Sequence, residues 1–87
     1  MPRIFIPVQL RDVTAGQAEI EVGGTTVREV VEELERRFPG FRLRVCVGEE
    51  LSPALQVSVD GQFSRRGLDA RVAAESEVHL LPVFGGG

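Results

Sequence analysis

The stretch that decides the fold is GGTTVREVVEELERRFPG, residues 23–40, because it holds the clearest element of the chain. Its apolar residues recur every three or four positions, which gathers them on one side of a helix: Val27, Val30, Val31, Leu34 and Phe38. Thr26 precedes this stripe and Glu29 lies three residues after Thr26, which is the spacing of a capping box. A Pro-Gly pair then ends the pattern. The sequence therefore predicts a helix over residues 27–38 with one buried face.

Two runs before the helix alternate between apolar and polar residues, as strands with one buried face do. The inward side of residues 3–10 is Ile4, Ile6, Val8 and Leu10, and that of residues 18–22 is Ala18, Ile20 and Val22. A cluster of turn residues separates the two runs, so together they predict a β-hairpin. Pro7 has no backbone N–H to donate, and we expect it to mark a bulge or an unpaired edge in the first strand.

The chain after the helix predicts two further strands. Residues 55–63 predict a strand that enters a tight turn at Asp60-Gly61, and residues 77–83 predict the last strand. Val78 and Leu80 should face one side of that last strand. Residues 41–54 allow either a strand or a short turn of helix. Residues 64–76 are irregular, and Leu68 and Val72 are expected beneath the sheet.

These elements predict an α+β fold in which one mixed sheet of four to five strands is covered by a single main helix. The long connection after the helix lets the last strand lie parallel to the first. A length of 87 residues fits one domain. We assign this domain to residues 1–84 and expect a flexible glycine tail at residues 85–87.

Composition excludes several classes of function. The net charge of −3 argues against a nucleic-acid partner, because binding to phosphates needs a basic face. All ten basic residues are arginine, so the chain offers no lysine amine for acylation or Schiff-base chemistry. The short apolar start is interrupted by Pro7 and Arg11, which fits neither a signal peptide nor a membrane span. We expect a cytoplasmic protein without a membrane partner.

Few residues of the domain suggest chemistry of their own. Cys46 is the only cysteine, which leaves no internal disulfide and no cysteine-based metal cluster. A small hydrolase with a Cys46–His79 dyad stays an alternative, although a lone cysteine is more often a small core residue. Arg65 and Arg66 fit either an acidic partner or a plain solvated turn. We assign no catalytic and no metal-binding residue.

The end of the chain, HLLPVFGGG at residues 79–87, places three glycines directly after an apolar strand. Residues 82–87 span about 20 Å when extended, and the glycines fit a slot too narrow for any other sequence. The reactive group would be the terminal carboxylate of Gly87. A carboxylate resists nucleophiles until it becomes a mixed anhydride, for instance with AMP. This chain lacks the residues for that step, so a partner enzyme must perform it.

The hairpin, the capped helix ending in RRFPG, the VSVDG strand and turn, and the final EVHLLPVFGGG together resemble one family. They resemble the ubiquitin-like sulfur-carrier proteins of the ThiS/MoaD type, which have the β-grasp fold. The likeness is strongest to the cysteine-biosynthesis carriers. Their first strand also holds a proline before an LR…T.GQ stretch, as in IPVQLRDVTAGQ at residues 6–17.

The resemblance implies that an adenylating, E1-like activating enzyme uses ATP to convert Gly87 into a transient acyl-adenylate. Sulfur transfer then gives a C-terminal thiocarboxylate, which donates sulfur to a biosynthetic synthase. Gly86 and Gly87 match the terminal diglycine of the family, while Gly85 stands where the family often has alanine. No cofactor would bind the chain itself, and a metallopeptidase acting on the C-terminus is a further partner. The final acceptor stays open, because carriers for thiamin, molybdopterin, cysteine and thio-natural products share one fold.

Two alternatives use the same terminus. One is a ubiquitin-like protein modifier conjugated through Gly87, and the other is the small subunit of a molybdopterin-synthase-like complex. In each case we expect the outer face of the sheet and the chain end to contact the partner. The residues expected to make this contact are Leu81, Pro82, Phe84, Arg65 and Arg66.

Overall fold

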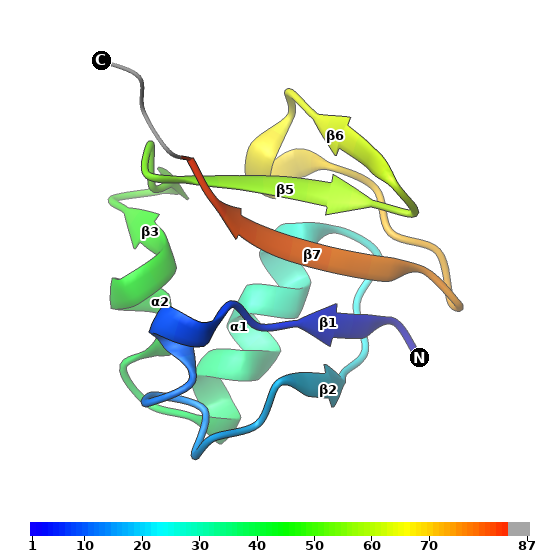
Figure 1. The fold of residues 1–87 in the computed structure, drawn as a ribbon. Helices are drawn as coiled ribbons and strands as arrows, with labels where there is room; N and C mark the ends of the chain where they lie inside the picture. The colour runs from blue at the N-terminus through cyan, green and yellow to red at the C-terminus, as the bar shows by residue number, and fades with distance from the viewer. Residues whose placement is uncertain (84–87) are drawn as a thin grey trace.

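The computed structural model describes residues 1–83, which form a five-stranded sheet covered on one face by helix α1 (Val27–Arg37) (Figure 1). The strands follow the spatial order β2-β1-β7-β5-β6. Their bounds are β1 (Arg3–Phe5), β2 (Glu19–Glu21), β5 (Leu55–Val59), β6 (Gln62–Ser64) and β7 (Glu77–Pro82). Strand β7 is parallel to β1 and antiparallel to β5. This mixed sheet with one main helix is the β-grasp fold, so the expected fold class is confirmed.

Helix α1 begins at the predicted Thr26 cap, and only one hydrogen bond of the predicted capping box differs. The Thr26 hydroxyl accepts a hydrogen bond from the Glu29 N–H at 3.2 Å. The Glu29 carboxylate does not return to Thr26 but accepts from the backbone N–H of Thr25, at 2.7 Å, and from its hydroxyl, at 2.9 Å. These two bonds hold the pKa of Glu29 below its ordinary value. The helix ends at Arg37, one residue before the predicted end.

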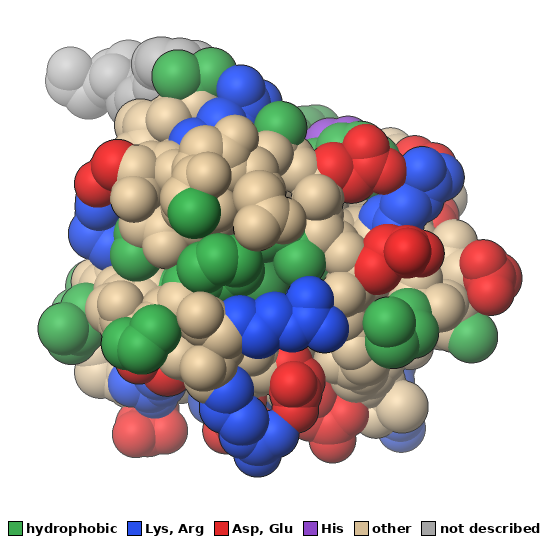
Figure 2. Space-filling model, turned by 90° about the horizontal axis from the view of Figure 1, so that it is seen from below, with side chains coloured by type: hydrophobic (Ala, Val, Ile, Leu, Met, Phe, Trp, Pro, Cys, Tyr) green, Lys and Arg blue, Asp and Glu red, His purple; other side chains and the backbone are tan. Residues whose placement is uncertain are grey.

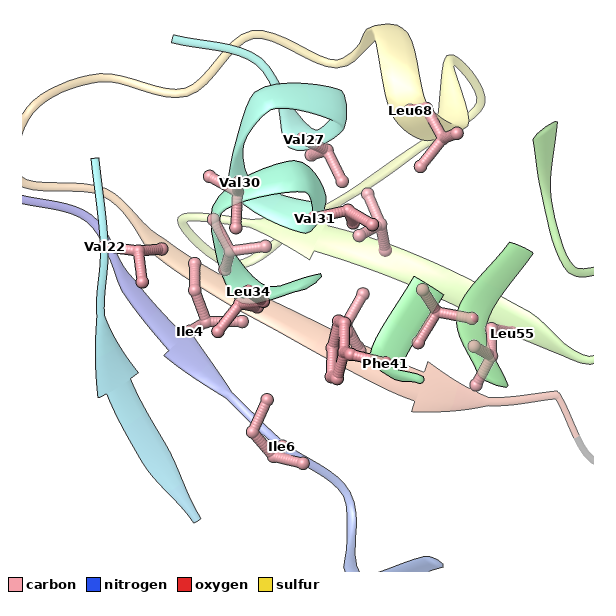
Figure 3. Close-up of a cluster of buried hydrophobic side chains, with 14 of the residues drawn as sticks. Ile4, Ile6, Val22, Val27, Val30, Val31, Leu34, Phe41, Leu55 and Leu68 are labelled. Atoms are coloured by element: carbon pink, nitrogen blue, oxygen red, sulfur yellow. The ribbon is translucent and has the colours of Figure 1, made fainter. Parts of the chain in front are cut away.

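The core lies between α1 and the sheet, and it contains the predicted stripe. Val27, Val30, Val31 and Leu34 are buried on the helix, facing the buried side of β1, β5 and β7. Phe41 adds the largest fully buried side chain from the short helix α2 (Phe41–Val45). Figure 3 shows these side chains pointing from the helices and strands into one shared interior.

The first predicted strand is too long. β1 ends at Phe5, and a single 3-10 turn, η1 (Val8–Leu10), replaces the second half of the expected strand. Pro7 causes the change, because it cannot donate to a ladder and its carbonyl instead accepts from the Leu10 N–H at 2.9 Å. Val8 is therefore 73% exposed rather than inward. Ala18, also expected inward, is exposed, since β2 begins only at Glu19.

The open alternative for residues 41–54 is resolved in favour of a short helix. Gly40 begins α2 with a φ of 100°, a left-handed value that favours glycine. The Glu35 carboxylate accepts hydrogen bonds from the backbone N–H groups of Gly40 and Arg42, which keep its pKa below the ordinary value. After α2, only a two-stranded ribbon follows, formed by β3 (Cys46–Val47) and β4 (Glu50–Leu51). Leu43 and Val45 thus lie in α2, where Leu43 is 84% exposed, and Val47 lies in β3.

The later elements follow the prediction closely. Asp60 and Gly61 both have positive φ values, 51° and 83°, and form the tight turn between β5 and β6. Leu68, in the 3-10 turn η2 (Gly67–Asp69), and Val72 are buried as expected. No helix within residues 1–83 has the length and apolar content needed to cross a membrane.

Replacement of Leu34 by alanine tests the placement of the core. Leu34 is fully buried against the sheet, so Leu34→Ala should lower the free energy of unfolding by about 2–5 kcal/mol in urea denaturation. Leu43→Ala is the matched control, and its exposed side chain should change that free energy by less than about 0.5 kcal/mol. Equal losses in the two variants would contradict the core described above.

Candidate functional site

Strand β7, which precedes the end of the chain, lies at the centre of the sheet. It lies between β1 and β5, and its alternation buries Val78 and Leu80. Backbone pairing continues past the strand, because the Val83 N–H donates to the Ala54 carbonyl at 2.8 Å. The predicted residues Phe84, Gly85, Gly86 and Gly87 lie outside the described residues. The predicted site therefore follows directly, along the sequence, from a strand that is paired on both sides.

The outward side of β7 forms an aromatic pair with β1. Phe5 and His79 are directly opposite in the parallel register, and their rings stack with centroids 4.3 Å apart and planes 4° apart. The Arg3 guanidinium lies 5.9 Å from the Phe5 ring centroid. It also bridges Glu19 on β2, at 2.8 Å, and Glu77 on β7, at 3.0 Å. A charged group thus borders the stack on one side.

An apolar hollow of about 290 Å³ opens beside this stack. We call it the apolar hollow, and its lining includes Phe5, Pro7, Ala18, His79 and Leu81. Arg11 borders it, with its guanidinium Nε held by the Ile6 carbonyl at 2.9 Å. Exposed apolar surface rimmed by charge is typical of a protein–protein contact. The hollow can therefore receive an apolar side chain of a partner close to the end of β7.

The expected partner-binding residues fall on two surfaces rather than one. Leu81 lines the apolar hollow, whereas Arg65 and Arg66 line a second hollow beside β6. Pro82 is half-buried at the end of β7, opposite Leu55, and lines neither hollow. Their role in partner binding stays a prediction, because nothing in the fold itself identifies a bound partner.

Of the residues that line the apolar hollow, sequence reasoning assigned only Leu81 to partner binding, and it missed Phe5, Pro7 and Ala18 among others. The signal that could have found Phe5 was the predicted parallel pairing of the first and last strands. Given that pairing, an outward Phe5 and an outward His79 must lie on the same face of the sheet. The exact register that places them opposite each other is not encoded in either strand alone.

Cys46 and His79 do not form a catalytic pair. Cys46 is buried in the core, on the helix side of the sheet, and burial raises the pKa of its thiol. His79 instead points outward and stacks on Phe5. Among residues 1–83, no three His, Cys, Asp or Glu side chains are grouped so that they could hold a metal ion.

The mixed sheet and the one main helix packed across it define a protein of the ubiquitin-like, β-grasp class. The ThiS family model matches residues 4–87, and the chain belongs to the ThiS family. Among curated protein sequences, no significant match to this chain is found.

Solved structures agree with this assignment. A chain of the Amycolatopsis orientalis BexX/CysO complex has a TM-score of 0.91 and 31% identity, with 100% of both chains covered. Mycobacterium tuberculosis CysO has a TM-score of 0.88 and 26% identity, with 95% of this chain and 99% of that chain covered. SAMP1 from Haloferax volcanii, a small archaeal modifier protein, has a TM-score of 0.74 and 27% identity, with 99% and 98% covered. The chain is thus a ubiquitin-like sulfur carrier close to CysO, and not an enzyme.

The buried state of Cys46 can be tested by its reaction with a disulfide reagent. A thiolate is the reacting form, so burial and a raised pKa should slow the reaction of the native protein at least about tenfold relative to the urea-unfolded chain. Ellman's reagent measures both rates, and Cys46→Ala, which has no thiol, gives the blank. Equal rates in the native and unfolded chains would mean an accessible thiol and would revive the hydrolase alternative.

Proposed function

We propose that the carboxylate of Gly87 is adenylated by a partner enzyme and converted to a thiocarboxylate that donates sulfur in biosynthesis. The observation that carries this proposal is the sequence PVFGGG at residues 82–87, which continues directly from the central strand β7 of a ThiS-family chain. The domain then serves as a handle that the partner grips, and the glycine end enters the partner's active site. In this scheme the chain supplies the reacting carboxylate, and the partner enzyme supplies the catalysis.

Activation makes the carboxylate reactive by replacing a poor leaving group with a good one. One oxygen of the Gly87 carboxylate attacks the α-phosphorus of ATP, pyrophosphate leaves, and an acyl-adenylate forms. A hydrosulfide ion then attacks the carbonyl carbon, the carbon–oxygen bond to AMP breaks, and AMP and a proton leave the thiocarboxylate. The chain binds no cofactor in this scheme, since ATP is used by the activating enzyme.

Glycine suits this end of the chain for a steric reason. The last three residues have no Cβ, so an enclosing channel can contact their backbone closely. Attack on the carbonyl of Gly87 also meets no side chain on the adjacent carbon. A channel of this width would exclude other carboxyl termini, which gives the activating enzyme its selectivity.

The apolar hollow is the surface that we assign to partner docking. Leu81 lies within it, and Pro82 and Phe84 follow along the chain toward the glycines. Apolar anchors near the centre of an interface usually contribute most of the binding free energy. The similar chain from Amycolatopsis orientalis was crystallised in a BexX/CysO complex, which supports a partner protein for this chain as well.

The partners that fit this scheme are an E1-like activating enzyme, a sulfur-accepting synthase and a metallopeptidase acting on the C-terminus. Similarity to two CysO chains favours cysteine biosynthesis as the destination of the sulfur. The scheme places the carrier in the cytoplasm, where ATP is available.

A protein modifier is the second candidate, favoured by the similarity to the small archaeal modifier SAMP1. The same adenylation would precede it, but a lysine amine of a target protein would then attack instead of sulfide. This chain contains no lysine, so it cannot accept a second copy of itself through a side chain. Conjugates in the host would therefore be single additions rather than chains of carriers.

Intact-mass spectrometry tests the proposed thiocarboxylate. With the activating enzyme of the host, ATP and sulfide, the wild-type protein should gain the mass difference between one sulfur and one oxygen atom. The variant that lacks Gly87 should gain nothing and keep its melting temperature, because the deleted residue follows the last described strand. A wild-type chain that stays unmodified under these conditions would contradict the carrier mechanism. Target proteins whose lysines are joined to the carboxyl group of Gly87 would indicate the modifier instead.

Replacement of Phe84 separates docking from folding. Phe84→Ala should raise the KM of the activating enzyme for the carrier by about tenfold, as loss of an interface anchor does, while thermal unfolding stays unchanged. Leu43→Ala, which removes an exposed apolar side chain on α2, is the control and should leave KM unchanged. A large fall in the melting temperature of Phe84→Ala would place that side chain in the core.

A further inference from the structure

Three arginines gather in one hollow without a carboxylate to pair with among residues 1–83. Ion pairs in this part of the chain engage five other arginines: Arg3, Arg28, Arg36, Arg42 and Arg44. None of these pairs involves Arg65, Arg66 or Arg71, which line a hollow of about 630 Å³ beside β6. We call this the basic hollow. Three arginines without an ion pair among residues 1–83 thus lie together, which suggests a binding role for this hollow.

The rest of the visible charge is distributed differently. Figure 2 shows acidic and basic side chains interspersed on the face seen from below, in keeping with the ion pairs. The β5–β6 hairpin, which forms one wall of the basic hollow, lies at the opposite end of the molecule, at the top of Figure 1. Three arginines therefore line one hollow of a chain whose net charge is −3, and two of them, Arg65 and Arg66, also border a neighbouring hollow whose lining includes Glu49, Glu50 and Asp69.

The backbone around the basic hollow is fixed at several points. The Arg66 N–H donates to the Ser64 hydroxyl at 3.0 Å, and its carbonyl accepts from the Asp69 N–H at 2.9 Å. Residues 70–72 are bound to the start of α1, because the Ala70 carbonyl accepts from Val27 N–H and Val72 N–H donates to the Thr25 carbonyl. The guanidinium groups thus extend from a rigid frame, which lowers the entropy lost when they bind.

The single carboxylate in the lining, that of Asp60, is already engaged. It accepts hydrogen bonds from the Glu77 N–H at 2.9 Å and from the Ser76 hydroxyl at 2.8 Å. It therefore holds the turn to the start of β7 rather than neutralising the arginines. Three guanidinium groups and one carboxylate leave the hollow with a net positive charge.

We propose that the basic hollow binds an acidic segment of the activating partner, and this inference rests on the proposed function. Guanidinium groups pair with carboxylates through two parallel hydrogen bonds, which a peptide rich in Asp and Glu can supply. Phe63, 63% exposed in the same lining, offers an apolar surface for a neighbouring side chain of that segment. The combination of charge and one aromatic ring fits a peptide better than an inorganic anion.

The geometry of the sheet links this hollow to the glycine end. β6 ends at Ser64, opposite Val57 of β5, and β5 begins at Leu55, opposite Pro82 at the end of β7. Arg65 and Arg66 thus follow β6 toward the same end of the sheet from which the chain continues to the glycines. The Arg65 and Arg66 side of the basic hollow therefore lies toward the end of β7 at Pro82, whereas its Asp60 and Gln62 side lies toward the start of β7.

A nucleic acid is the competing occupant, and the charges disfavour it. Three arginines would neutralise few phosphates, and the remaining acidic surface would repel a polyanion. A short acidic peptide carries its charge over a length that the hollow can match.

The first experiment examines the hollow without any enzyme. The probe is a blocked six-residue peptide of four glutamates and two leucines, added to isotope-labelled protein and followed by backbone amide shifts. Shifts should concentrate at residues 62–71, and a peptide with glutamine in place of glutamate should produce none. The triple variant Arg65→Gln, Arg66→Gln, Arg71→Gln should bind at least about tenfold more weakly. Arg37→Gln is the control, because Arg37 lies on α1 outside the hollow and has no ion pair within residues 1–83.

The outcomes of the titration decide the proposal. Scattered shifts, or equal affinity in the triple variant and the wild type, would overturn it. Tighter binding of a single-stranded oligonucleotide than of the acidic peptide would overturn the choice of partner. A triple lysine variant keeps the charge but not the paired geometry, and it should recover part of the lost affinity.

The second experiment uses the activating enzyme and distinguishes a failure of the acidic-segment inference from a failure of the proposed function. In ATP–pyrophosphate exchange, the triple glutamine variant should show a KM for the carrier about tenfold higher with kcat little changed. Raising sodium chloride from about 50 mM to about 500 mM should raise the wild-type KM much more than that of the variant. Identical KM values and salt responses would overturn this inference. Absence of exchange with the wild type would instead count against the proposed function, while the peptide titration would still decide the hollow.

Discussion

The contact between the apolar stripe of α1 and the sheet is the interaction on which the rest of the structure depends. Leu34 and its neighbours on α1 are buried against the inward side of β1 and β7. Burial of such a side chain stabilises the fold by about 1.5–3 kcal/mol, more than an exposed ion pair contributes. β1 and β7 are distant in sequence, and the surface that both pack against on the helix reinforces the parallel backbone pairing between them. The same contact therefore supports the strand that precedes the glycine end of the chain.

The period of two along β7 lets one strand serve two purposes. Its inward residues, Val78 and Leu80, belong to the core, while His79 and Leu81 are directed to the outer face. A partner can thus bind the outer face without disturbing the packing beneath it. This separation would let a small domain remain rigid while its outer face is in contact with the proposed partner. The ion pairs of Arg3 border the site and add little stability, since they are exposed.

Two hollows on one small domain fit the function proposed above, in which the reactive group is at the end of the carrier. In that proposal the apolar hollow beside β7 supplies buried contact area, and the basic hollow beside β6 supplies long-range attraction. Charge increases the rate of encounter and orients the partner, whereas apolar contact slows dissociation. A carrier must be released after each transfer, and surfaces of modest size allow that. The division also permits different partners to use different parts of the same domain.

The sequence by itself determined the elements whose signals are local. The helical stripe, the Thr26 cap, the turn at Asp60-Gly61 and the alternation of β7 all appear in the structure, since each depends on neighbours within a few residues. Alternation failed to indicate the structure of residues 8–10 and 41–45, where Pro7 and the Gly40 turn impose a different backbone. The glycine end and its family were evident from composition and order alone. Only the tertiary structure decided which outward residues meet, because the stacking of Phe5 on His79 depends on strand register. It likewise decided that Arg71 joins Arg65 and Arg66, because hydrogen bonds between the 70–72 segment and the start of α1 hold that segment in place.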